Sequence, residues 1–180
     1  NDILCDKVII DDKYAAFEAV QSLIDKGRKK IALVTTVDYV SVGKLRTDGY
    51  TKALLDNGIP FNENLIIKIE DIDTCEITIG KLLEDKAIDA VFAVNELFAV
   101  TIIKTANKIG LNVPNDLAVI AFTDGIISKY STPTITTVSQ SGIKMGNKAA
   151  KMLIERLESE EDEEDENYKT EVIETHLIER

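Results

Sequence analysis

The side chains best suited to bind a small molecule follow directly after an apolar run of strand length. Thr123 and Asp124 come after the run at 117–122, which begins behind a turn signal at 114–116. In open α/β sheets, ligands bind at the carboxyl ends of the strands. A hydroxyl and a carboxylate at such an end can form hydrogen bonds with a polar molecule. The sequence therefore predicts a ligand site here.

Two more polar side chains hold comparable positions. Asn95 follows the apolar run at 89–93, and its amide can both donate and accept hydrogen bonds; capping the next helix is an equally natural role. Arg46 lies near the start of the helix after the second strand, where its planar guanidinium can hold ligand oxygens. An ion pair with Asp48 or Glu84 is the alternative.

Strands and helices alternate along the chain and must position these residues. Runs of strand length occupy 7–10, 30–35, 65–69, 89–93, 117–122, 136–138 and 171–177. Helical periodicity occupies 16–24, 45–57, 74–85, 96–109 and 141–157, and Gly27, Gly58 and Gly110 are predicted to end three of these helices. The alternation predicts an α/β fold, a parallel sheet with helices on both faces.

Composition limits the class of protein. The chain has 180 residues, 44% of them hydrophobic, which is enough for one domain or a little more. No run approaches the roughly 18 apolar residues of a membrane span. Cys5 and Cys75 are not part of a CxxC motif, so we expect neither a disulfide framework nor a metal site. We also expect no cofactor. Two isolated thiols fit a protein of the reducing cytoplasm. Because the sequence starts at Asn1 and not at a methionine, we interpret it as a fragment of a longer chain.

Acidic residues between 158 and 166 account for most of the net charge of −11. Like charges repel, which predicts a solvated loop there; the alternative is a docking site for a basic partner. Nucleic-acid binding requires clustered Lys and Arg, so any DNA contact must come from residues outside this sequence.

Two helices carry apolar surface beyond what one sheet would cover. The helix from Leu97 to Ile109 is apolar over more than a single stripe, which predicts a subunit interface; deep packing between neighbouring elements is the alternative. The late helix has Gly146, Ala149 and Leu153 on one narrow face, which suits close packing against another segment.

Taken together, several spaced segments resemble the effector-binding part of the lactose-repressor (LacI/GalR) family of transcriptional regulators. The matching segments are RTDGY at 46–50, ALLDNGI at 53–59, DAVFAVNE at 89–96, VPNDLAVIAFTD at 113–124, and residues 8–12, 23–32, 140, 145–146 and 176–180. The resemblance implies a periplasmic-binding-protein-like (type I) core of two lobes with the ligand between them. Residues 1–140 would then be the C-terminal lobe. Residues 141–180 would supply a crossover helix, the acidic loop and a final strand returning toward the first lobe.

The resemblance also implies roles for individual residues. Arg46 matches the family's ligand arginine, and Gln140 matches a residue that borders the cleft. Thr123 stands where the family commonly has an Asp, and Val42 where sugar-binding members often have Ser or Thr. Ile72 would line the cleft in place of an aromatic residue. Because fewer side chains can pair with hydroxyls, we expect a sugar-like effector other than a simple free hexose.

The partners of such a regulator follow from the same resemblance. The family dimerises through the helix that contains Leu97 and Val100 and through the segment with Tyr130, which agrees with the apolar excess of that helix. A helix-turn-helix outside this sequence would read DNA, and the homodimer would hold two of them at half-site spacing.

Other classes of function remain as alternatives. The chain has one histidine, His176, and none of the GxSxG, GxxxxGKS or GxGxxG motifs, so we do not expect an enzyme. A solute-binding or sensor domain outside transcription would share the fold. A regulator with a protein co-effector is the third possibility.

Overall fold

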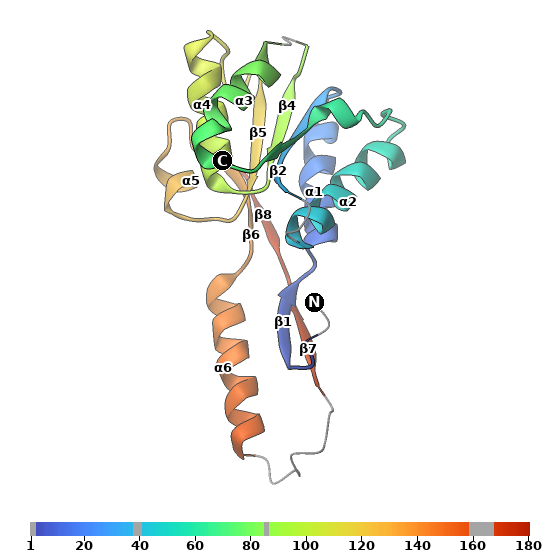
Figure 1. The fold of residues 1–180 in the computed structure, drawn as a ribbon, viewed down its shortest axis with the longest axis vertical. Helices are drawn as coiled ribbons and strands as arrows, with labels where there is room; N and C mark the ends of the chain where they lie inside the picture. Colours follow the sequence, from blue (N-terminus) through green and yellow to red (C-terminus); the bar gives the residue numbers. More distant parts are fainter. Residues whose placement is uncertain (1–2, 38–40, 85–86, 159–167) are drawn as a thin grey trace.

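A six-stranded sheet positions the candidate site in this computed structural model, which describes residues 3–37, 41–84, 87–158 and 168–180. The strand order is β3-β2-β4-β5-β6-β8. Helices α1 and α2 cover one face and α3 and α4 the other (Figure 1). The strands are β2 (Ile31–Thr36), β3 (Ile66–Ile69), β4 (Ala90–Ala93), β5 (Ala118–Phe122), β6 (Thr136–Ser139) and β8 (His176–Ile178). The helices are α1 (Asp12–Asp25), α2 (Ser41–Asp56), α3 (Cys75–Leu83), α4 (Glu96–Lys108) and the short α5 (Ile126–Tyr130).

The central strands are apolar because both of their faces are covered. All four residues of β4 and the first five of β2 are buried. The predicted α/β class is confirmed, with one correction. β8 runs antiparallel to β6, so the sheet is parallel only up to its last strand. The single strand predicted at 171–177 is wrong: Glu174 and Thr175 interrupt it, and its first half forms β7 (Thr170–Ile173) in another sheet.

Glycines determine where helices end and how two of them pack. Gly27, Gly58 and Gly110 have φ of 86°, 69° and 83°, the left-handed geometry predicted for the ends of α1, α2 and α4. Gly49 lies where α2 crosses α1. A Cβ atom there would stand 2.2 Å from the Lys13 carbonyl oxygen, so the crossing requires glycine.

A smaller unit extends from the carboxyl edge of the sheet. β1 (Lys7–Ile10) pairs in parallel with β7, and α6 (Gly142–Glu158) contacts β1 (Figure 1). Met152 is the one residue of α6 described as buried, whereas Leu153, Ile154 and Leu157 are exposed. The apolar face predicted for this helix is therefore uncovered among the described residues.

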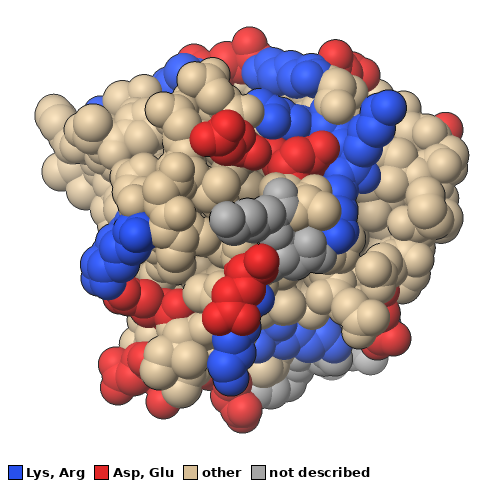
Figure 2. Space-filling model, turned by 90° about the horizontal axis from the view of Figure 1, so that it is seen from above, with Lys and Arg blue, Asp and Glu red and all other residues tan. Residues whose placement is uncertain are grey.

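Seen from the amino-terminal edge of the sheet, basic and acidic side chains are interspersed (Figure 2). The acidic loop predicted at 158–166 lies, beyond Glu158, outside the described residues. Over the described part of the chain, no helix has the length and apolar character needed to cross a bilayer.

Candidate functional site

A hollow of about 500 Å³, lined by several polar side chains, lies at the carboxyl ends of β5 and β6. It is lined by residues 139–144 together with Thr123, Asp124 and Lys129. Three residues predicted to bind ligand, Thr123, Asp124 and Gln140, thus line one hollow. Its volume falls within the roughly 300–1,000 Å³ typical of small-molecule sites.

The backbone on both sides of the hollow is in an unusual conformation. Thr123 has a φ of 79° and Ser141 a φ of 51°; these are the non-glycine residues with positive φ in the described chain. Such geometry is costly for a β-branched residue. The Thr123 amide is held in place by donating to the Val138 carbonyl at 2.9 Å. Strained residues of this kind concentrate at ligand sites, which supports a binding role.

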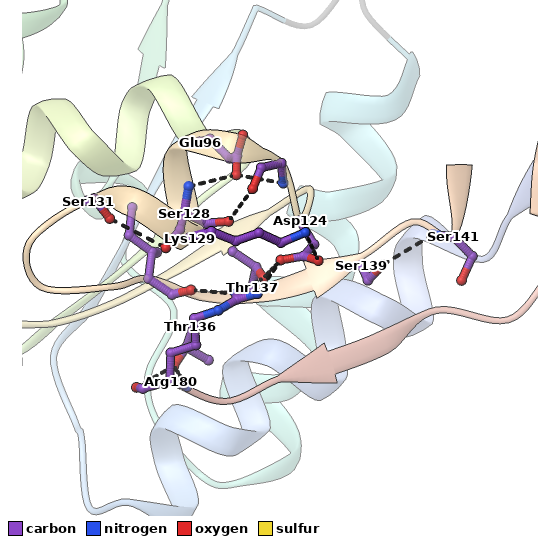
Figure 3. A network of polar contacts seen from close by, with 12 residues as sticks. Glu96, Asp124, Ser128, Lys129, Ser131, Thr136, Thr137, Ser139, Ser141 and Arg180 are labelled. Carbon is purple, nitrogen blue, oxygen red and sulfur yellow. Dashed lines mark hydrogen bonds and ion pairs between the residues drawn. The ribbon is translucent and has the colours of Figure 1, made fainter. Parts of the chain in front are cut away.

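Asp124 is held by a network of protein donors (Figure 3). Its Oδ1 accepts from Arg180 Nη2 at 2.5 Å and from Thr137 Oγ1 at 3.2 Å, and Lys129 Nζ lies 3.4 Å from its Oδ2. Burial acts to raise the pKa of this carboxyl, but the hydrogen bonds from Arg180 and Lys129 outweigh it and the pKa is lowered. The carboxylate is therefore charged and already paired.

Arg180 also ties the end of the chain to β6. Its Nη1 donates to the Ile135 carbonyl at 3.0 Å and to Thr137 Oγ1 at 2.9 Å. The adjacent loop is fixed from the other side, because Glu96 Oε1 accepts from the amides of Gly125 at 2.7 Å and Ser128 at 3.0 Å (Figure 3). The loop behind the hollow is thus anchored to both α4 and the C-terminus.

Arg46 is buried and its donors are engaged. Its Nε donates to Asp12 Oδ1 at 2.8 Å, its Nη2 lies 2.7 Å from the same oxygen, and its Nη1 donates to the Val94 carbonyl at 2.7 Å. The guanidinium also stacks over the Phe122 ring, 3.5 Å from its centroid. Burial lowers the pKa of Arg46, and Asp12 opposes that shift. The ion pair is with Asp12, so the partners suggested from sequence, Asp48 and Glu84, were wrong.

The other predicted ligand residues lie outside the hollow. Asn95 caps α4, since its Oδ1 accepts from the Phe98 amide at 2.8 Å, and the capping role inferred from sequence is confirmed. Val42 lies in the first turn of α2 and Ile72 on a 3-10 turn (Ile72–Thr74) after β3; both are surface-exposed. Their roles as ligand residues remain predictions.

Several side chains at this edge were missed from sequence. Thr35 is buried at the end of β2, and its Oγ1 lacks a hydrogen-bond partner, a property it shares with Thr105 among the described residues. Ser139 and Lys144 line the hollow. The pattern that identified Thr123, a hydroxyl ending an apolar run, also applies to Thr35 and Ser139.

The residues predicted for dimerisation lie on the outer side of α4 and on α5. Leu97 and Tyr130 are 45% and 81% exposed, and Val100 is half-buried. The opposite side of α4, including Phe98 and Ile102, is buried against the sheet. The helix therefore presents apolar side chains to both the core and the surface.

Comparison with known proteins places this fold in a family. Residues 20–180 match the periplasmic binding protein-like domain. The chain belongs to this family. It is 35% identical over 173 residues to the HTH-type transcriptional regulator MalR of Clostridium butyricum, covering 95% of this chain and 50% of the relative. The chain spans about half the length of the curated relatives it matches.

Solved structures of periplasmic-binding-protein-like domains agree with the assignment. The transcriptional regulator CelR–cellobiose complex aligns over the whole chain and 54% of its own, with a TM-score of 0.89 and 29% identity. A LacI-family regulatory protein from Chloroflexus aggregans aligns over the whole chain and 64% of its own, with a TM-score of 0.89 and 26% identity. The predicted resemblance to the lactose-repressor family is confirmed. The relatives compared are transcriptional regulators, not enzymes.

Proposed function

We propose that this chain is the effector-sensing part of a LacI-type transcriptional regulator. The observation that carries the proposal is the hollow at the carboxyl edge of the sheet, lined by Thr123, Gln140 and other polar side chains, in a chain whose relatives are regulators. In the CelR complex, a protein with this fold holds cellobiose. A sugar-like small molecule is therefore the effector class that we propose.

The uncovered surface of the small unit supports a two-lobed arrangement. β1, β7 and α6 lie beyond the carboxyl edge of the sheet, and α6 exposes Leu153, Ile154 and Leu157. We assign residues 141–180 to the connection toward a first lobe, which would cover this face and close the hollow. Effector binding between the lobes would change their relative orientation and thereby the affinity of a separate helix-turn-helix for DNA. Such a regulator acts in the cytoplasm.

Within the site, the geometry suggests different roles for the proposed residues. Thr123 and Gln140 would contact the effector, because both line the hollow. Arg46 and Asp124 would act chiefly by holding the edge in shape, since their charged groups are paired within the protein. Asn95 would do so by capping α4. Val42 and Ile72 would be reached only by a ligand that extends beyond the hollow.

We propose that the regulator is a homodimer that pairs through α4 and α5. The exposed apolar side chains of Leu97 and Tyr130 would be covered in that interface. This arrangement would place two DNA-binding domains at half-site spacing.

The proposal can be tested on the full-length protein with two measurements. A thermal-shift screen with mono- and disaccharides, sugar acids and sugar phosphates would identify a ligand, because binding to the folded state raises the melting temperature. Fluorescence anisotropy with operator DNA would then show whether that ligand changes DNA affinity. We expect both effects, and we expect Gln140→Ala to weaken them while Gln21→Ala does not, because Gln21 is a half-buried residue of α1 that does not line the hollow.

Two results would refute the proposal. A ligand that stabilises the protein without changing its DNA affinity would favour a sensor or solute-binding role outside transcription. Stabilisation and altered DNA binding that require a second protein, with no small-molecule effect, would favour a protein co-effector.

A further inference from the structure

We infer that the effector carries an anionic group, a phosphate ester or a carboxylate, and that Lys144 is the residue that selects it. This inference names the ligand class of the proposed effector site and rests on that proposed function. It follows from the charges that line the hollow and from how they are paired.

The carboxylate in the hollow is neutralised by a residue that does not itself line the hollow. Asp124 is the acidic residue among those that line it, and its Oδ1 is paired with Arg180 at 2.5 Å. Arg180 does not line the hollow, so it removes negative charge without occupying ligand space. Lys129 and Lys144 then leave the hollow with an excess of positive charge.

The two lysines differ in what they contact. Lys129 Nζ lies 3.4 Å from Asp124 Oδ2 and is partly committed to that pair. Lys144 is exposed at the start of α6 and makes no ion pair or side-chain hydrogen bond within the described chain. Its ammonium group can therefore move onto a ligand without breaking an existing contact.

The remaining polar groups suit a hydroxylated body attached to that anion. The side chains of Thr123, Ser139, Ser141 and Gln140 offer hydroxyl and amide donors and acceptors. A wholly neutral sugar would be a poorer match, because its hydroxyl protons are best accepted by an available carboxylate. The carboxylate at hand is already occupied by protein donors.

Isothermal titration of the full-length protein tests the inference with matched pairs of probes. Glucose and ribose are compared with glucose 6-phosphate, ribose 5-phosphate and gluconate, so that phosphate and carboxylate are distinguished. We expect an anionic sugar to bind at least about tenfold more tightly than its neutral counterpart, because a charge-assisted hydrogen bond is lost with the neutral ligand. The preference should shrink as ionic strength rises.

Two variants locate the effect. Lys144→Gln should weaken binding of the anionic sugar by about tenfold and leave any binding of the neutral sugar unchanged. Lys151→Gln is the matched control, since Lys151 is exposed on the same helix but does not line the hollow. It should change the affinity less than about twofold, within the effect of a screened surface charge.

The outcomes separate this inference from the function on which it rests. Neutral sugars that bind as tightly as anionic ones, or a Lys144→Gln variant with unchanged affinity for the anionic sugar, would overturn the anion preference and leave the sugar-sensing function standing. Heat from none of the probes, in protein that is folded by circular dichroism, would count against both.

Discussion

At the scale of single residues, Arg46 shows how a ligand residue inferred by resemblance can have a structural role. Its guanidinium joins α2 to Asp12 at the start of α1, to the end of β4 through Val94, and to the end of β5 through Phe122. These contacts converge at the carboxyl edge of the sheet. Arg46 therefore shapes the edge even where it does not touch the effector.

We predict that Arg46→Met lowers the free energy of unfolding by about 3 kcal/mol, because Asp12 is left as an unpaired buried carboxylate. The pair is buried, with side chains only 8% and 10% exposed, so solvent screens it little. Urea denaturation measures the change. Adding Asp12→Ala to Arg46→Met should recover part of the loss. An Arg46→Met variant as stable as the parent chain would show that the ion pair does not stabilise the fold.

The sequence predicted which side chains lie at the carboxyl edge of the sheet better than it predicted which of them are already paired there. Thr123 was predicted from its place after a buried strand and Gln140 from the family resemblance, and both line the same hollow. Local patterns do not show that Asp124 meets Arg180, 56 residues away, or that Arg46 meets Asp12, 34 residues away. Those pairings depend on how the strands are ordered in the sheet.

At the scale of elements, the amphipathic patterns predicted the long helices and central strands because burial determines both. The short helix α5 was missed, since five residues carry too little periodicity. The division between β7 and β8 was also missed. Their alternating residues fit one long strand, and the separation arises from pairing with β1 on one side and β6 on the other.

The crossing of α1 and α2 depends on the absence of a side chain at Gly49. We predict that Gly49→Ala lowers the free energy of unfolding by about 1–3 kcal/mol, because the new methyl group would overlap the Lys13 carbonyl and force the helices apart. Gly80→Ala in α3 is the control: a Cβ atom there meets no neighbour, so the substitution should stabilise by up to about 1 kcal/mol. Urea denaturation of both variants compares them. Equal changes in the free energy of unfolding for the two variants would contradict a close crossing of α1 and α2 at Gly49.

An ion-pair cluster connects α3 to α4 and should depend on pH. Hydrogen bonds from Lys104 and Lys108 lower the pKa of Glu76 from 4.5 to about 2. A carboxyl whose pKa is lower in the folded state stabilises the protein above its unfolded pKa, and that contribution is lost as pH falls toward the folded value. The difference in melting temperature between the parent chain and Glu76→Gln should therefore be largest near neutral pH and disappear as pH falls from 4.5 toward about 2.

The exposed Glu63→Gln, outside any ion pair in the described residues, is the control for the Glu76 comparison. The difference in melting temperature between the parent chain and Glu63→Gln should not become smaller as pH falls. A Glu76→Gln difference that persists unchanged at acid pH would mean that the helices are not held by this charge cluster.

At the scale of the whole molecule, two apolar surfaces lie on different sides of the sheet. One is the face of α6 beyond the carboxyl edge, and the other is the outer side of α4 with α5. A large, exposed apolar surface is unfavourable in water, so each is expected to be covered in the complete protein. We assign the first to the other lobe and the second to a second copy of the chain.

The second assignment leads to a prediction about assembly. In the full-length protein, Leu97→Glu should convert a dimer into monomers. Leu97 is 45% exposed in the single chain, and dimerisation would bury the new charge there without a partner. A loss of about 2 kcal/mol in association corresponds to roughly thirtyfold weaker dimerisation, which sedimentation velocity over a concentration series would detect. Leu55→Glu introduces the same charge at an exposed leucine of α2 and should leave the dimer intact. If both variants remain dimeric, pairing must use another surface than α4.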